Sequence, residues 1–363
     1  MKVLHVITGL GIGGAEQQLR LLLRHLPVRG SVVTLTNPGA VARGLRDDGV
    51  PVAHLGMRGN RDLMALPRLT RLIRQGGFDV VHTHLYRACV YGRLAARLAG
   101  VRTVIATEHS LGATQIEGRA LNDGARALYL ASERLGTSTV AVSDTVARRL
   151  TEWGVRPGRI RVVPNGIDVR RFAHDEDARR AARRRLGLAP DAFVVGGVGR
   201  LTAGKRFDTL IRALVALPEA RLLLVGDGDR RQHLARLAWE CGVMDRVVWA
   251  GACHDGLPGL LSAMDVFVSA SADEAFGLAV VEALAAGLPV LYVASPALDD
   301  LPAADAPGAR RIGRSVPDLV SALRDLCRDH PPGRLPVPPA ARRYDIAHSA
   351  QQLMTLYREA SSR

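Results

Sequence analysis

Two carboxylates and two cations in the second half of the sequence have the types and spacing to bind one phosphate-bearing ligand. Glu274 and Glu282 stand at the two ends of E-A-F-G-L-A-V-V-E, and Arg200 and Lys205 stand in G-R-L-T-A-G-K. Two cations suit a diphosphate, whereas a carboxylate in an apolar run, as at Glu282, needs polar partners such as sugar or ribose hydroxyls. Lys205 is one of two lysines in a chain that otherwise uses arginine, which indicates a need for a compact ammonium there.

Glycines lie where backbone N–H groups can approach an anion. Gly277 and Leu278 begin an expected helix shortly after Glu274, and a helix N-terminus favours negative charge. A second glycine-rich turn, G-L-G-I-G-G-A-E at residues 9–16, follows a strand pattern and opens a helix in the first half. Its spacing is not that of the dinucleotide-binding fingerprint, so it is either a phosphate-binding turn or a tight strand-to-helix connection.

The other groups of potential metal ligands favour structural explanations. Asp227 and Asp229 in D-G-D are expected to form a turn and the N-cap of the following helix. His82 and His84 alternate at the end of a strand, and the sequence shows no third ligand beside them. The four cysteines lack metal-ligand or redox spacing and are expected to be reduced thiols. We therefore expect neither a metal site nor a cofactor.

The elements that must position these groups alternate between strands and helices. Short, apolar, β-branched runs without polar alternation are typical of parallel strands covered on both faces. In the first half, strands are expected at 3–7, 32–36, 52–55, 80–83, 103–107 and 139–142, and helices at 15–26, 63–74, 88–98 and 144–153. In the second half, strands are expected at 193–198, 220–225, 247–250, 266–269 and 290–293, and helices at 207–217, 230–241, 278–286 and 317–328.

This order predicts an α/β protein with two Rossmann-like, doubly wound parallel-sheet domains that face a central cleft. A length of 363 residues suits two domains. We place an N-terminal domain at 1–165, a C-terminal domain at 166–340, and a final helix at 341–363 that returns to the first domain. Because ligands bind at the carboxyl ends of strands in such sheets, Arg200 and Lys205 are expected at the same edge.

The charge of the chain is uneven. The net charge is +14, with 23 basic and 11 acidic side chains in residues 1–165, against 26 and 24 in residues 166–363. Such an excess attracts phosphate-rich partners. The helix expected at 63–74 sets Arg68, Arg71 and Arg74 beside apolar residues, which fits either contact with an anionic membrane or simple coverage of the sheet. No apolar run reaches the roughly 18 residues of a membrane span, and we expect a cytoplasmic location.

The motifs together resemble those of the retaining glycosyltransferases of family four, which have the two-Rossmann GT-B architecture. The similar segments are G-G-A-E at 13–16, E-H at 108–109, V-P-N-G-I-D at 163–168, G-R-x-x-x-x-K at 199–205, G-D-G at 226–228 and E-A-F-G-L-x-x-x-E at 274–282. The resemblance implies transfer of a hexose or N-acetylhexosamine from a nucleotide-diphosphate sugar, without a metal, in polysaccharide biosynthesis or a related route. The acceptor it implies is a glycan, a lipid-linked molecule or a small molecule.

The resemblance also implies a role for each matching residue. Arg200 and Lys205 would hold the donor diphosphate, Glu274 would bind hydroxyls of the donor sugar, and Glu282 would bind the ribose. His109 would lie over the donor sugar, and a structural histidine at a strand end is the alternative. The remaining donor-binding positions that it implies are Gly13, Gly14, Gly226, Phe276, Gly277 and Leu278.

One segment departs from the family pattern. After G-L-P-V the family continues with a Gly-Gly turn and a glutamate, whereas Leu291–Leu301 reads L-Y-V-A-S-P-A-L-D-D-L. We expect a loop of another shape there.

Two other functions remain open on the sequence alone. One is a nucleotide-sugar epimerase or hydrolase on the same scaffold. The other is a basic nucleic-acid-binding protein, which the isoelectric point of about 10.7 suggests. An aromatic content of 4% and the lack of a recognised nucleic-acid-binding module argue against this last function, so we expect no nucleic-acid partner.

Overall fold

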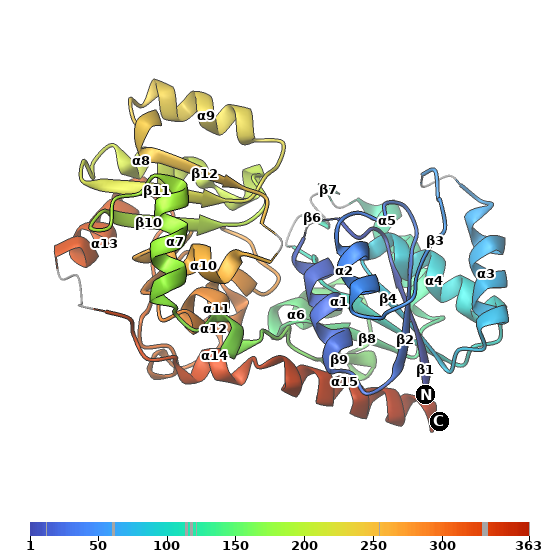
Figure 1. Cartoon of the computed structure of the whole chain (residues 1–363). Coiled ribbons are helices and arrows are strands. Elements are labelled where there is room, and N and C mark those ends of the chain that lie inside the picture. Colours follow the sequence, from blue (N-terminus) through green and yellow to red (C-terminus); the bar gives the residue numbers. More distant parts are fainter. Residues whose placement is uncertain are drawn as a thin grey trace. The chain divides into compact units, whose positions relative to one another are not determined.

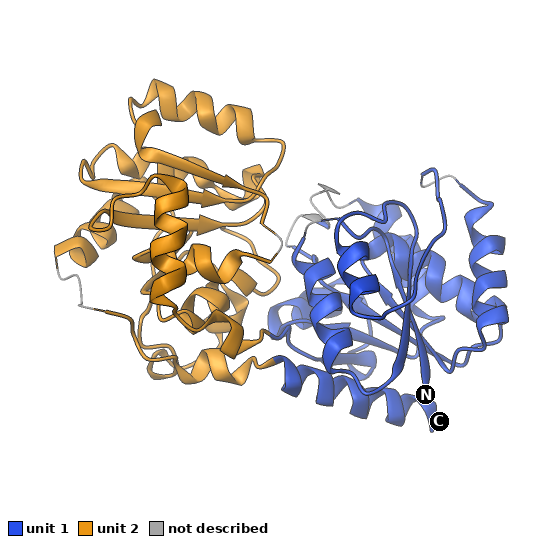
Figure 2. Ribbon diagram, in the orientation of Figure 1, with its two compact units in different colours: residues 1–166, 346–363 blue, residues 167–345 orange. Residues whose placement is uncertain are grey.

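The computed structural model describes residues 1–11, 13–59, 62–112, 115–116, 119–120, 122–253, 255–328 and 333–362 (Figure 1). The chain forms two compact units, residues 1–166 with 346–363, and residues 167–345 (Figure 2). Each unit is an α/β domain built on its own parallel sheet, which confirms the predicted fold class.

The sheet of the first unit has the strand order β3-β2-β1-β4-β5-β8-β9, and all its neighbouring pairs are parallel. Its strands are β1 (Lys2–Ile7), β2 (Arg29–Thr34), β3 (Val52–His54), β4 (Val80–His84), β5 (Thr103–Glu108), β8 (Ser138–Ala141) and β9 (Ile160–Val162). A short antiparallel pair, β6 (Gln115–Ile116) and β7 (Arg119–Ala120), lies outside it. The central strands β4 and β5 are buried throughout, and most of their residues are apolar or β-branched.

Helices cover both faces of this sheet. On one face, α1 (Gly14–His25) and α15 (Ile346–Ser361) share a core with alternate residues of β1 and β4. On the other face, α3 (Ala65–Gly76) and α4 (Tyr86–Leu98) pack against the intervening residues of the same strands. The unit also contains α2 (Val41–Asp47), α5 (Asp123–Glu133) and α6 (Asp144–Trp153). Ser143 caps α6: its hydroxyl accepts the Val146 N–H at 3.1 Å.

The sheet of the second unit has the strand order β12-β11-β10-β13-β14-β15 and is also parallel. Its strands are β10 (Phe193–Val198), β11 (Ala220–Val225), β12 (Val247–Gly251), β13 (Val266–Ser269), β14 (Val290–Tyr292) and β15 (Ala309–Arg311). Its helices are α7 (Glu176–Leu186), α8 (Phe207–Leu214), α9 (Arg231–Glu240), α10 (Leu257–Ala263), α11 (Leu278–Ala285), α12 (Pro296–Asp299), α13 (Val316–Arg328) and α14 (Pro339–Arg343).

The single helix predicted at the end of the chain is two helices, α14 and α15. The break falls at Tyr344 and Asp345 because Tyr344 is buried in the second unit. Its ring meets Phe276 edge-on at 5.0 Å, and its hydroxyl donates to the Ala297 carbonyl at 2.8 Å. The Tyr344 carbonyl accepts the Ile167 N–H at 2.8 Å, so the last residues of this unit are fixed to its first.

Two loops cross at the carboxyl edge of the second sheet with their backbones in contact. One follows β10 and carries Gly199 and Arg200, and the other follows β11 and begins at Gly226. A Cβ at Gly226 would lie 1.9 Å from the Gly199 carbonyl oxygen, and its φ of +142° also favours glycine. The Leu201 N–H donates to the Asp227 carbonyl at 3.0 Å and ties the loops together. The position of Arg200 therefore depends on the neighbouring loop.

We expect Gly226→Ala to separate these loops. The added methyl group meets backbone atoms that cannot rotate away, so the free energy of unfolding should fall by about 1–3 kcal/mol. Gly204→Ala is the matched control, because a Cβ at Gly204 in the adjacent turn would meet nothing within 4 Å. Urea unfolding of both variants measures the difference, and equal stability of the two would refute the crossing.

Candidate active site

The cations and the first carboxylate of the predicted donor site lie at one edge of the second sheet. Arg200 follows β10, and Lys205 ends the 3-10 turn that leads into α8. Glu274 lies in the loop that follows β13. Since β10 and β13 are parallel neighbours, their carboxyl ends place these three residues at the same edge.

Lys205 and Glu274 form an ion pair at this edge. The Lys205 Nζ lies 2.5 Å from the Glu274 Oε1, and the side chains are 33% and 15% exposed. An ammonium has three N–H groups, so Lys205 can hold Glu274 and still donate to a phosphate. Arg200 is exposed and makes no side-chain hydrogen bond or ion pair within the described part of the chain. An incoming anion therefore meets one paired and one unpaired cation.

The start of α11 adds backbone donors to the same region. Gly277 caps the helix in the left-handed conformation, with φ of +102°. The N–H groups of Val280 and Val281 donate to the Gly277 carbonyl, whereas those of Leu278 and Ala279 make no backbone hydrogen bond among the described residues. Phe276 uses its side chain in the core, where it is 3% exposed and packs on Tyr344. The groups that this segment can offer to an anion are therefore backbone N–H groups.

The segment that departs from the family pattern packs behind this turn. It forms β14 and α12, and Ser295 between them is fully buried. A Cβ at Gly277 would lie 2.4 Å from the Ser295 Oγ, so the two segments are in close contact. The Ala297 N–H donates to the Phe276 carbonyl at 2.9 Å. A buried serine and a short helix thus support the turn that presents Gly277.

Glu282 lies in the second turn of α11 and makes no side-chain hydrogen bond to the residues that the structure describes. The carboxyl group of Glu282 is enclosed by protein, although other atoms of the residue are partly exposed. This burial raises the pKa of Glu282 to about 7, and the positive charge of Arg171 opposes the shift. Ligand hydroxyls would supply the donors that the carboxylate lacks.

The D-G-D segment is a turn, but it does not cap the next helix. The Asp227 Oδ1 accepts the Gly228 N–H at 2.8 Å. The N-cap of α9 is Arg230, whose side chain makes no capping bond, so the N-cap prediction for D-G-D is wrong. The Arg230 N–H donates at 2.9 Å to the Leu201 carbonyl of the crossing loop, which delays the start of the helix.

The first unit carries the other predicted site residues at the carboxyl edge of its own sheet. Gly13 is the N-cap of α1, and Gly14 is its exposed first residue. His109 directly follows β5, and its Nε2 lies 3.1 Å from the Nδ1 of His84. Its own Nδ1 is buried and has no hydrogen-bond partner among the described residues. Burial lowers the pKa of His109 to about 4, so the ring is neutral at neutral pH.

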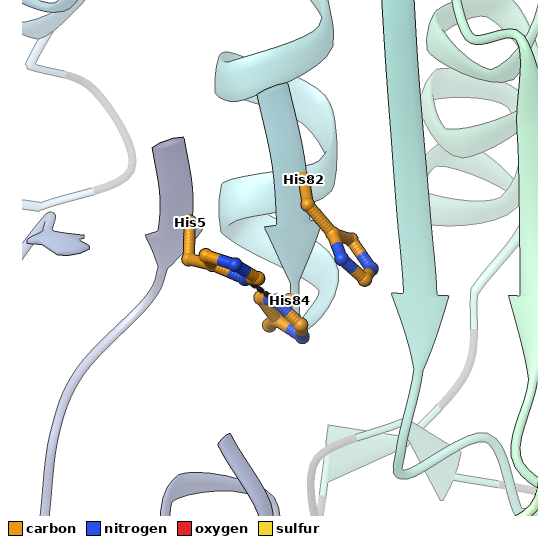
Figure 3. A group of neighbouring side chains, drawn as sticks. All are labelled: His5, His82 and His84. Carbon is orange, nitrogen blue, oxygen red and sulfur yellow. Dashed lines mark hydrogen bonds between the residues drawn. The ribbon is translucent and has the colours of Figure 1, made fainter. Parts of the chain in front are cut away.

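His5 is a residue that the sequence did not single out. The parallel register of β1 and β4 sets it opposite His82. His5, His82 and His84 have nitrogen atoms within 4.8 Å of one another, and all three residues are at most 1% exposed (Figure 3). The alternation of His82 and His84 hinted at a shared face, but the strand register that adds His5 is not readable from the sequence.

Models of two families match the chain: Glycosyltransferase Family 4 over residues 12–171, and Glycosyl transferases group 1 over residues 178–334. A D-inositol 3-phosphate glycosyltransferase of Xylanimonas cellulosilytica is 32% identical, over 80% of this chain and 74% of its own length. The chain belongs to the family 4, group 1 glycosyltransferases. This membership favours glycosyl transfer over the epimerase, hydrolase and nucleic-acid-binding functions that the sequence left open.

One further relative and one solved structure are also similar to this glycosyltransferase. The UDP-Gal:alpha-D-GlcNAc-diphosphoundecaprenol alpha-1,3-galactosyltransferase of Escherichia coli is 29% identical over 64% of the chain, and the match spans 62% of that enzyme's length. The crystal structure of Anabaena HepE in complex with UDP and glucose superposes with a TM-score of 0.86 at 23% identity. That match covers 99% of this chain and 100% of HepE. The superposition shows the GT-B fold.

The raised pKa of Glu282 predicts a pH dependence of stability. Its folded-state pKa of about 7 exceeds the ordinary value of 4.5. The native state therefore binds the extra proton, and the wild type loses stability as the pH rises between these two values. Glu282→Gln mimics the protonated group, so its free energy of unfolding should match the wild type at the lower pH and exceed it at the higher.

Urea titrations at several pH values measure this difference. Glu240→Gln, at an exposed position on α9, is the control and should show no such trend. If the free energy of unfolding of the wild type rose relative to that of Glu282→Gln with increasing pH, the assignment of a buried, protonated carboxyl would be contradicted.

Proposed function

We propose that this glycosyltransferase transfers a hexose or N-acetylhexosamine from a UDP-sugar to a phosphate-bearing acceptor, with retention of configuration and without a metal ion. The observation that carries the proposal is the edge of the second sheet. There, Arg200, Lys205 and the start of α11 supply positive charge, and Glu274 supplies an acceptor for hydroxyls. The uridine base is supported by the name of the Escherichia coli relative and by the UDP bound to HepE.

In this proposal, the carboxyl edge of the second sheet stabilises the nucleoside diphosphate as it leaves the sugar. As the bond to the anomeric carbon breaks, negative charge builds on the diphosphate, and preorganised cations and N–H groups lower the barrier. Glu274, held by Lys205, would orient sugar hydroxyls beside the cation, and Glu282 would accept from the ribose. Retention is inferred from the family resemblance, and the departing phosphate would then take the proton of the acceptor.

The first unit would bind the acceptor and complete the donor site. In this proposal Gly13 and Gly14 approach the diphosphate, and His109 lies over the donor sugar. The basic excess of residues 1–165 suits an acceptor that carries phosphate. The printed names of two relatives, one acting on a diphosphoundecaprenol and one on D-inositol 3-phosphate, are consistent with that class.

We expect Arg200→Ala and Lys205→Ala to abolish transfer while the fold remains intact. Each variant removes charge-assisted contacts to phosphate of about 1.5–3 kcal/mol before any further gain in the transition state. Arg212→Ala removes one exposed charge from α8 and is the matched control, with unchanged turnover. Near-normal transfer by either site variant would rule out the diphosphate assignment.

A donor panel tests the wider proposal. We expect UDP-sugars to raise the melting temperature more than GDP-, ADP- or dTDP-sugars. Transfer should persist in EDTA, and the product should keep the anomeric configuration of the donor. Loss of activity in EDTA that magnesium restores would contradict the metal-free mechanism, and an inverted product would contradict retention.

Two exposed apolar residues just before α3, Leu63 and Met64, form a tip that also favours reversible contact of the first unit with an anionic membrane. The apolar stripe of α3 is used in the core, where Leu69 and Ile73 are fully buried. Just before the helix, however, Leu63 and Met64 are 79% and 66% exposed, and Arg71 is exposed on α3. None of the helices in the described ranges is both long and apolar enough to cross a bilayer. Contact would therefore rest on this tip and on nearby arginines.

Liposome co-sedimentation tests the contact. We expect binding to vesicles with anionic lipid that is lost at high salt, because each basic residue near such a surface contributes about 1 kcal/mol. Leu63→Ser with Met64→Ser should weaken it. Trp239→Ser, which removes a side chain that is 74% exposed on α9, is the control and should not. Equal absence from anionic and neutral vesicles would exclude the contact.

A further inference from the structure

Three imidazoles in the first unit form a hydrogen-bonded row. The His5 Nδ1 lies 3.0 Å from the His84 Nε2, the contact drawn in Figure 3, and the His84 Nδ1 lies 3.1 Å from the His109 Nε2. The rings of His5 and His84 are stacked, with 19° between their planes. The row therefore runs from β1 across β4 to the residue that follows β5.

His82 lies beside this row but does not belong to it. Its Nδ1 lies 2.6 Å from the Tyr357 hydroxyl, and its Nε2 lies 2.6 Å from the Thr107 hydroxyl. Both of its nitrogens are thus engaged by hydroxyl groups, one of them from α15. His82 links the C-terminal helix to the sheet and leaves His84 to contact His109.

A metal ion is the other ligand that three clustered histidines suggest. Five of the six ring nitrogens of His5, His82 and His84 already lie at hydrogen-bond distance from a protein partner. The sixth, the His5 Nε2, is buried without a partner among the described residues. A metal would have to break most of these bonds, so the geometry favours the row.

The neutral state of the rings fixes where their protons lie. Burial lowers the pKa of His5 to about 3 and holds that of His84 well below its ordinary value, so each ring has one N–H at neutral pH. Either direction of the row leaves an N–H without a protein acceptor at one of its ends, on the His5 Nε2 or on the His109 Nδ1. His5 is fully buried within β1, whereas His109 lies at the carboxyl edge of the sheet and is partly exposed, so a ligand can supply an acceptor only at the His109 end. The proton therefore belongs on the His5 Nδ1, which donates to the His84 Nε2. His84 in turn donates from Nδ1 to the His109 Nε2.

We propose that His5 and His84 are positioning residues that hold the proton of His109 on Nδ1, where it donates to an oxygen of the bound donor sugar. The assignment rests on the proposed function, since it gives His109 its ligand. It explains the buried, unpartnered Nδ1 of His109 as a donor that awaits that oxygen. Leu85, next to His84, adopts φ of +73°, a strained conformation that persists where the surroundings demand it.

Two substitutions of His84 separate its two contacts. An asparagine amide nitrogen falls near the position of Nδ1, so His84→Asn keeps a donor for His109. A glutamine amide falls near Nε2, so His84→Gln keeps the contact with His5 and releases His109. We expect His84→Gln to lower kcat about tenfold or more with little change in the donor KM, and His84→Asn to stay within a few-fold of the wild type.

His82→Asn and His82→Gln are the matched controls, because His82 is equally buried on the same strand. They should lower the melting temperature without a difference in kcat between the two amides. NMR of isotopically labelled imidazole nitrogens reads the tautomer directly. We expect the proton of His109 on Nδ1 in the wild type and in His84→Asn, and a mixture of tautomers in His84→Gln.

A wild-type His109 with its proton on Nε2 would overturn the assignment, as would folded His84→Asn and His84→Gln variants with equal kcat. Zinc that co-purifies with the wild type and is lost in His5→Ala would also overturn it. The NMR result does not depend on turnover. A wild type without transfer activity would therefore count against the proposed function and leave the tautomer question answered.

Discussion

The carboxyl edge of the second sheet depends on one close approach of two backbones. Parallel strands bring the loops after β10 and β11 to the same edge, where they cross so closely that a Cβ at Gly226 would clash with the Gly199 carbonyl oxygen. This contact sets the path of the loop that carries Arg200 and leads to Lys205. Lys205 then pairs at 2.5 Å with Glu274, which lies in the loop after β13.

The opposite edge of the same sheet uses charge in another way. Asp265, just before β13, accepts the Val194 N–H at 2.7 Å and pairs with Arg179 and Arg183 at 2.6 and 2.7 Å. These buried charges are satisfied by one another and anchor α7 to the sheet, which is the condition under which buried charge is tolerated. At the carboxyl edge, Arg200 lacks such a partner among the described residues. The charges around Asp265 thus stabilise the packing of α7 on the sheet, whereas the charge of Arg200 at the carboxyl edge remains available for a ligand.

The sequence predicts the central strands well because β4 and β5 are buried on both faces and are rich in β-branched residues, although they also contain His82, His84 and Glu108. It misses β15 and α12, which are short and take their shape from contacts distant in sequence. Ser295, for example, is placed by its packing on Gly277. The motif around Glu274 is visible in the sequence because residue type and spacing determine it. The N-cap expected in D-G-D failed because a distant carbonyl, that of Leu201, had already engaged the backbone of Arg230.

The different environments of His82 and His84 cannot be predicted from the sequence motif. They share a strand, a face and nearly complete burial, and the sequence gives no reason to treat them differently. Their partners separate them: hydroxyls of Thr107 and Tyr357 occupy one ring, and imidazoles occupy both nitrogens of the other. A hydroxyl can rotate to suit either tautomer of His82, whereas an imidazole neighbour forces a choice on His84. The difference between the two histidines therefore lies in the partners that their rings reach, and not in residue type, strand or burial.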